Sequence, residues 1–249
     1  MTPDRTEQLC AWVASIAIVI GFAAGNTRNF QTRILPNDLD SPVLAMELLE
    51  NHDDLSKIVG SPSDKKNNRE QMKQLTYIDF AFIAAYACLF LLAALRLWQR
   101  SWRFTAVLAA LAGCGAAAFD VRENLLIFET LKCECTTPRG ASLVKWALTF
   151  VALLLLSPVF IDRAVKPLRR FIGYIAGAST AAAGFVGLSG IGMHADPLVE
   201  VGATIMAFAL LVGWLFFATR AALAGGLVAG LNRLASVYGF RKLADWREE

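Results

Sequence analysis

The chain has 249 residues, of which 56% are hydrophobic and 18% are charged, with a formal net charge of +3. Soluble domains are typically about 45–50% apolar and about 25% charged, so this composition indicates a membrane protein. The basic residues form no stripe with interleaved aromatic residues, which argues against a nucleic-acid-binding protein.

Six apolar segments approach the roughly 20 residues that a helix needs to cross a bilayer. The first segment is expected to be a retained helix rather than a signal peptide, because its leader carries Asp4 and Glu7 against a single Arg5. We therefore expect an all-α polytopic membrane bundle of six transmembrane helices. The predicted segments are residues 9–25, 77–98, 104–128, 143–161, 171–193 and 197–219.

Basic residues are concentrated in the short loops on one side of this predicted bundle. They follow the second, fourth and sixth segments, whereas the loops on the other side contain fewer of them. The positive-inside rule then places both termini in the cytoplasm. We expect a multi-pass protein of the bacterial inner membrane, with membrane lipids as its surroundings. The basic residues at the end of, or after, the second and fourth segments are Arg96, Arg100, Arg103, Arg163, Lys166, Arg169 and Arg170.

The first outer loop is long enough to fold. Ser41 followed by proline provides an N-cap and a first-turn proline. Leu44, Leu48 and Leu55 then recur at helical spacing, and Gly60 closes the segment. This pattern predicts a helical extracytoplasmic cap over the bundle.

The predicted organisation has three parts. Residues 1–161 form a four-helix membrane core that includes the outer loop 26–76, and residues 162–219 add two transmembrane helices. In residues 220–249 leucines recur on one face opposite polar residues, which predicts an amphipathic tail on the cytoplasmic surface.

The third segment contains polar residues at a depth where they are costly. Asp120 lies about 24 Å along the helix from its start, at about 1.5 Å per residue, which is the outer third of the membrane. Asp120, Glu123 and Asn124 share one helical face, whereas Arg122 points elsewhere. Each of these polar residues therefore needs a partner or a function.

Asp79 and Lys145 enter the second and fourth segments from the same outer side, at a depth similar to that of Asp120. One interpretation is structural: Lys145 pairs with Asp120 or Asp79, and Asn124 satisfies backbone groups. The other is an outward-facing acidic pocket in which these residues bind a cation, a proton or a polar head group. The functional alternatives are a protein that binds or passes a small ligand or lipid, a non-catalytic scaffold or assembly partner, and an enzyme acting on lipid.

Familiar catalytic motifs and cofactor signatures are absent, so we predict no cofactor and no metal. Asp196, next to a proline, and Glu200 are expected to stabilise the start of the sixth helix rather than to join His194 in a metal site. One intervening residue makes a mutual disulfide of Cys133 and Cys135 strained, so we expect free or intermolecularly paired thiols.

The fifth segment is rich in glycine, with Gly173 and Gly177 spaced as a GxxxG motif. Such spacing allows close helix packing. The partner helix belongs either to the same chain or to a second copy, so a homo-oligomer through this helix is one expectation.

The first four segments, residues 9–161, resemble a widespread group of bacterial polytopic membrane proteins of uncharacterised function. The similarity consists of the helical outer loop, an Asp with a downstream Tyr in the second helix, an Asp-x-x-Glu-Asn motif in the third, and Lys-Trp opening the fourth. Arg122 departs from the pattern, since an apolar residue is more usual there. The resemblance implies the same site positions but no mechanism. The matching residues are Asp79, Tyr86, Asp120, Glu123, Asn124, Lys145 and Trp146.

Overall fold

The computed structural model describes residues 3–25, 35–60, 68–133, 136–161 and 167–223. The structure is 89% helical and contains no strand in these residues. The predicted all-α fold is therefore confirmed. The 26 residues after Leu223, which include most of the predicted amphipathic tail, lie outside the described residues.

Six of the described helices are long and apolar enough to cross a membrane. Each predicted segment coincides with one of them, and the fourth ends in a 3-10 turn, η2 (Ser157–Phe160). Several of these helices are longer than the predicted apolar segments, because their helical turns continue into the polar residues at their ends. The six are α1 (Pro3–Gly25), α4 (Arg69–Gln99), α5 (Arg103–Cys133), α6 (Arg139–Leu156), α7 (Pro167–Gly192) and α8 (Asp196–Leu223).

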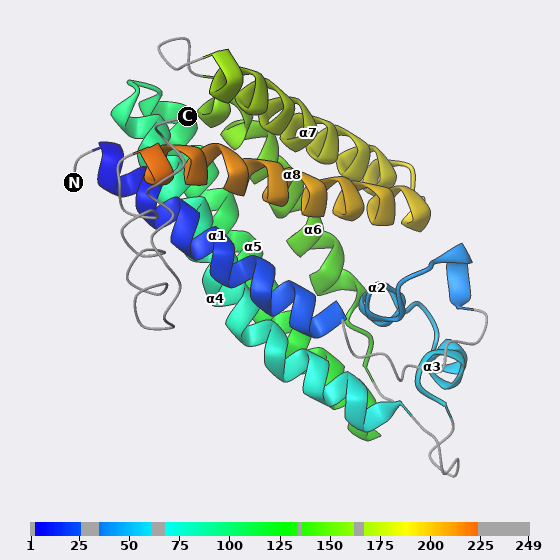
Figure 1. The fold of residues 1–249 in the computed structure, drawn as a ribbon. Coiled ribbons are helices and arrows are strands. Elements are labelled where there is room, and N and C mark those ends of the chain that lie inside the picture. The colour runs from blue at the N-terminus through cyan, green and yellow to red at the C-terminus, as the bar shows by residue number, and fades with distance from the viewer. Residues whose placement is uncertain (1–2, 26–34, 61–67, 134–135, 162–166, 224–249) are drawn as a thin grey trace, which may run out of the picture.

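The helices pack as a bundle in which α1 contacts α4 and α8, α5 contacts α4 and α6, and α7 contacts α6 and α8. Figure 1 shows that α1 begins and α8 ends at one end of this bundle. The two short helices α2 (Pro42–Glu47) and α3 (His52–Val59) lie at the opposite end (Figure 1). We refer to that end as the cap end.

The cap consists of η1 (Pro36–Asp38), α2 and α3, and it has its own buried apolar cluster. Ser41 caps α2 as predicted, accepting a hydrogen bond from the Leu44 backbone N–H at 3.3 Å. The predicted helical segment is divided into two helices, α2 and α3, and between them the Leu48 carbonyl accepts a hydrogen bond from Arg139 Nη1 at 2.8 Å. Contacts with Met72, Ile127 and Leu131 seat the cluster on α4 and α5.

The glycines of α7 are used for packing within the chain. A Cβ on Gly187 would lie 2.2 Å from the ring of Phe150, and one on Gly202 of α8 would lie 2.7 Å from the Gly187 Cα. A Cβ on Gly173 would lie 2.4 Å from the Phe160 carbonyl oxygen. These contacts identify α6, η2 and α8 as partners of the glycine face.

A buried ion-pair triad joins three helices at the end away from the cap. Glu7 of α1 binds Arg96 of α4 through Oε1 and Arg169 of α7 through Oε2, each at 2.6 Å. All three residues are at most 7% exposed. The interpretation of Arg96 and Arg169 as loop residues is therefore wrong, since each lies inside a helix and is buried. The Arg169 guanidinium also lies 4.4 Å from the centre of the Phe216 ring.

Asp196 and Glu200 of α8 accept hydrogen bonds from the cap. The Asp196 carboxylate accepts hydrogen bonds from Arg139 at 2.9 and 3.2 Å and from Asn37 at 2.9 Å. Glu200 accepts from the backbone N–H groups of Asp40 and Ser41, at 3.0 and 2.7 Å. Asp196 lies in the first turn of α8, where a negative charge is favourable, and both carboxylates in addition accept hydrogen bonds from outside their own helix.

Cys133, at the end of α5, is disulfide-bonded. The prediction that its thiol is free is therefore wrong. Its neighbour Cys135 lies outside the described residues.

Candidate functional site

Lys145 of α6 is the centre of a buried group of carboxylates that we call the Lys145 cluster, made of Lys145, Glu47, Asp120 and Glu123. The Lys145 Nζ lies 2.8 Å from Glu123 Oε1, 2.9 Å from Glu47 Oε2 and 3.4 Å from Asp120 Oδ1. An ammonium group has three N–H donors. Lys145 therefore forms ion pairs with three carboxylates and donates a hydrogen bond to one of them, Glu123.

The cluster continues toward α4 through two hydrogen bonds. Tyr86 donates its hydroxyl to Asp120 Oδ2 at 2.7 Å, and Asn124 donates its amide to Asp79 Oδ2 at 2.9 Å. The five residues predicted from the sequence thus lie in one group. Lys145 pairs with Asp120 as expected but not with Asp79, which has no ion pair among the described residues.

The α5 residues reach this group because of their helical spacing. Positions i, i+3 and i+4 lie on one face of a helix, so Asp120, Glu123 and Asn124 point inward together. Their exposed fractions are 5%, 0% and 2%. The intervening Arg122 and Val121 are exposed, as the same periodicity requires.

Glu47 is the member of the cluster that the sequence interpretation missed. It comes from the cap helix α2, and its Oε2 accepts both the Lys145 ammonium and a hydrogen bond from Trp146 Nε1 at 2.9 Å. The Lys145 Nζ also lies 4.8 Å from the centre of the Trp146 ring. A signal was present: Glu47 lies beside the buried leucines Leu44 and Leu48, where an unpaired carboxylate would be costly.

Acid exceeds base in this region. Asp79, Asp120, Glu123 and Glu47 are four carboxyl groups beside the single ammonium of Lys145. Asp120 Oδ1 and Glu123 Oε2 are buried and accept no hydrogen bond. Buried carboxylates without sufficient counter-charge or donors are destabilising. The cluster can therefore be stabilised by additional protons or by a bound cation.

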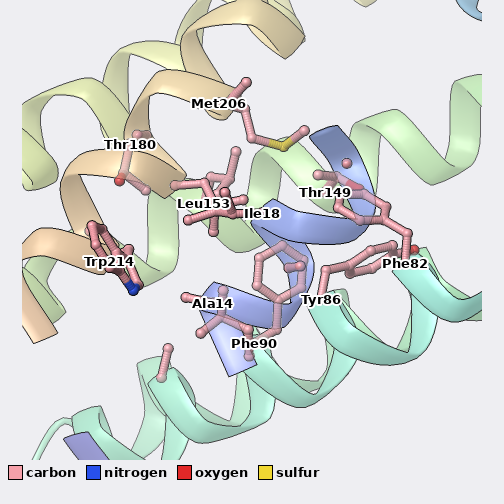
Figure 2. A pocket seen from close by; sticks show the side chains of 18 of the residues that line it. Ala14, Ile18, Phe82, Tyr86, Phe90, Thr149, Leu153, Thr180, Met206 and Trp214 are labelled. Atoms are coloured by element: carbon pink, nitrogen blue, oxygen red, sulfur yellow. The ribbon is translucent and has the colours of Figure 1, made fainter. Parts of the chain in front are cut away.

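An elongated cavity of about 490 Å³ lies beside the cluster. Its wall is mainly apolar and includes residues of α1, α4, α6, α7 and α8, while Glu47, Asp79, Asp120 and Lys145 line it near the cap end. Figure 2 shows side chains from these helices pointing into the same space. Labelled examples in Figure 2 are Ala14, Ile18, Phe90, Leu153, Thr180, Met206 and Trp214.

A smaller cavity of about 170 Å³ adjoins the cap. Four residues line both cavities: Gly21 of α1, Glu47 of α2, and Asp79 and Phe82 of α4. The smaller cavity also contacts Val43 of α2. These shared residues form the boundary between the cap and the interior of the bundle.

The arrangement combines apolar volume with a charged end. Ligand sites of about 300–1,000 Å³ with mainly apolar walls and a few polar groups are typical of small-molecule pockets. No group of His, Cys, Asp and Glu side chains in the described part of the chain is arranged to hold a metal ion. Comparison of the chain with protein-family models, with curated proteins and with solved structures found no match.

Proposed function

We propose that this integral membrane protein binds, or passes, a small amphiphilic ligand or lipid within its helical bundle. The apolar part of the ligand would occupy the large cavity, and its polar end would meet Asp79 and the Lys145 cluster. The single observation that carries the proposal is the 490 Å³ cavity with ionisable groups near one end only.

The length of the cavity supports a chain-like ligand. Its lining residues on α4 run from Asp79 to Ala93, which corresponds to about 20 Å of helix at about 1.5 Å per residue. Another part of the wall is made by the small side chains of Ala14 and Ala17 of α1. Apolar surface in this space is stabilised by contact with an apolar chain.

The polar groups support an end that is fixed in place. Asp120 and Lys145 are each 5% exposed, and they are held by α5 and α6 rather than by a loop. Side chains held on helices keep their geometry without an ordering cost when a ligand binds. The polar end of the ligand would therefore have a defined position.

A scaffold role is the second candidate, and the ion pairs favour it. Lys145 joins α6 to α5 and to the cap helix α2, so the cluster also stabilises the fold. In either role we place the protein in the bacterial inner membrane, with its termini cytoplasmic and the cap outside. Arg100 and Arg103, at the end away from the cap, support this orientation.

Cavity filling tests the binding function. Ala14 is 1% exposed and lines the cavity, whereas Ile16 on the same helix is 52% exposed. We expect Ala14→Phe to occupy the cavity and to remove a co-purifying amphiphile, and Ile16→Phe to retain it. Native mass spectrometry of the purified proteins measures the bound molecules. Identical bound lipid in wild type and both variants would contradict a ligand in the cavity.

A further inference from the structure

We propose that the ligand is an amphiphilic amine, whose protonated or quaternary ammonium group binds Asp79 and Asp120 at the cap end of the cavity. This inference depends on the proposed function and specifies the chemical class of its ligand. It follows from the charges around the cavity, the hydrogen-bonding state of its carboxylates and the aromatic rings beside them.

An anionic head group would find no free cation in this cavity. Lys145 is the only basic residue among the described residues that line it. Its ammonium group already forms ion pairs with Glu123, Glu47 and Asp120. A phosphate or carboxylate would add a negative charge beside these buried carboxylates and would compete with them for their counter-charge.

A cationic head group would meet two carboxyl groups, Asp79 and Asp120, beside the single counter-charge of Lys145. Asp120 is 5% exposed and lines the cavity, yet its Oδ1 accepts no hydrogen bond and lies 3.4 Å from the Lys145 ammonium. Asp79 lines the cavity beside it and is bonded to Asn124 without an ion pair among the described residues. An ammonium group between these two carboxylates would supply the missing positive charge.

The aromatic side chains near these carboxylates suit the same group. Phe82 and Tyr86 line the cavity one turn apart on α4, with ring centres 5.6 Å apart. Aromatic faces attract ammonium ions, and quaternary ammonium ligands are often bound in this way. Carboxylates and rings therefore favour a cation over a neutral polar group.

Photocrosslinking with matched probes tests the inference. The full-length protein in nanodiscs is titrated with three diazirine-bearing alkyl chains of equal length, which end in an amine, an alcohol or a carboxylic acid. We expect the amine to reach half-maximal labelling at a concentration about tenfold lower than the alcohol. One additional charge-assisted hydrogen bond provides an affinity difference of about this size. Labelling by the acid should be weakest.

Asp79→Asn isolates the head-group contact, because Asp79 makes no ion pair that the change would break in the described structure. We expect it to weaken amine labelling about tenfold and to leave alcohol labelling unchanged. Asp53→Asn, at an exposed position on α3, controls for attraction of amines to surface charge and should have no effect. Thermal melting checks that each variant is folded.

The outcomes separate this inference from the proposed function. If the alcohol or acid labels as strongly as the amine, or if Asp79→Asn leaves amine labelling unchanged, the amine assignment is overturned. The proposed function survives that result when Ala14→Phe still blocks labelling by every probe. If Ala14→Phe blocks none of the probes, both the cavity function and the amine assignment are overturned.

Discussion

Replacing Lys145 by methionine removes the positive charge that three buried carboxylates share. The side chains of Glu123, Asp120 and Glu47 are only 1%, 8% and 12% exposed, so water cannot replace the ammonium. Breaking a buried ion pair from one side costs about 3–5 kcal/mol. We expect Lys145→Met to lower the free energy of unfolding by that amount, measured by SDS titration in mixed micelles with circular dichroism.

A second substitution tests whether charge is the cause. Glu123→Gln in the Lys145→Met background removes one of the uncompensated carboxylates, so the double variant should be more stable than Lys145→Met alone. Contacting residues commonly show coupling of about 0.5–3 kcal/mol in such a cycle. Lys73→Met, at a position that is 34% exposed, is the control and should cost less than about 1 kcal/mol. A loss below about 1 kcal/mol for Lys145→Met, or zero coupling, would refute the reasoning.

Three further variants test other parts of the fold by the same unfolding measurement. Gly187→Ala would place a Cβ 2.2 Å from the Phe150 ring and should cost about 1–3 kcal/mol, whereas Gly192→Ala, with nothing within 4 Å, should be nearly neutral; equal effects would contradict the packing. Glu7→Gln removes the carboxylate of the buried triad and should lower the free energy of unfolding by about 3–5 kcal/mol. The exposed Glu70→Gln is its control and should lower it by less than about 1 kcal/mol. Ser41→Ala removes the α2 N-cap and should cost about 1 kcal/mol, with faster hydrogen exchange in α2; unchanged exchange would exclude that cap.

The transmembrane part of the fold was predictable because its signal is local. A membrane-spanning helix requires a continuous apolar run, and each of the six segments carries that requirement within its own residues. The inward face of α5 was predictable for the same reason, since the spacing of Asp120, Glu123 and Asn124 fixes their shared direction. The exposed Arg122 also follows from that spacing.

The partners of these residues were less predictable because they are separated along the chain. Glu47 is 98 residues from Lys145, and no local pattern connects a cap carboxylate with a transmembrane ammonium. Glu7 is 162 residues from Arg169, its partner in the triad. From the sequence alone, Arg96 cannot be distinguished from an arginine in a loop. Its buried ion pair with Glu7 forms only when α1 packs against α4 in the folded bundle. The cavity likewise depends on the packing of several helices.

Lys145 and Trp146 are adjacent on α6, and both bind the same atom, Glu47 Oε2. That oxygen belongs to the cap, so docking of the cap and the electrostatics of the cavity share one contact. Thermodynamic linkage between two such sites is reciprocal. A ligand in the cavity that weakens the Lys145–Glu47 ion pair also weakens the docking of α2. By the same coupling free energy, a molecule that displaces α2 weakens binding of that ligand in the cavity. A contact made on the surface of the cap, away from the cavity, would therefore alter ligand binding inside the cavity.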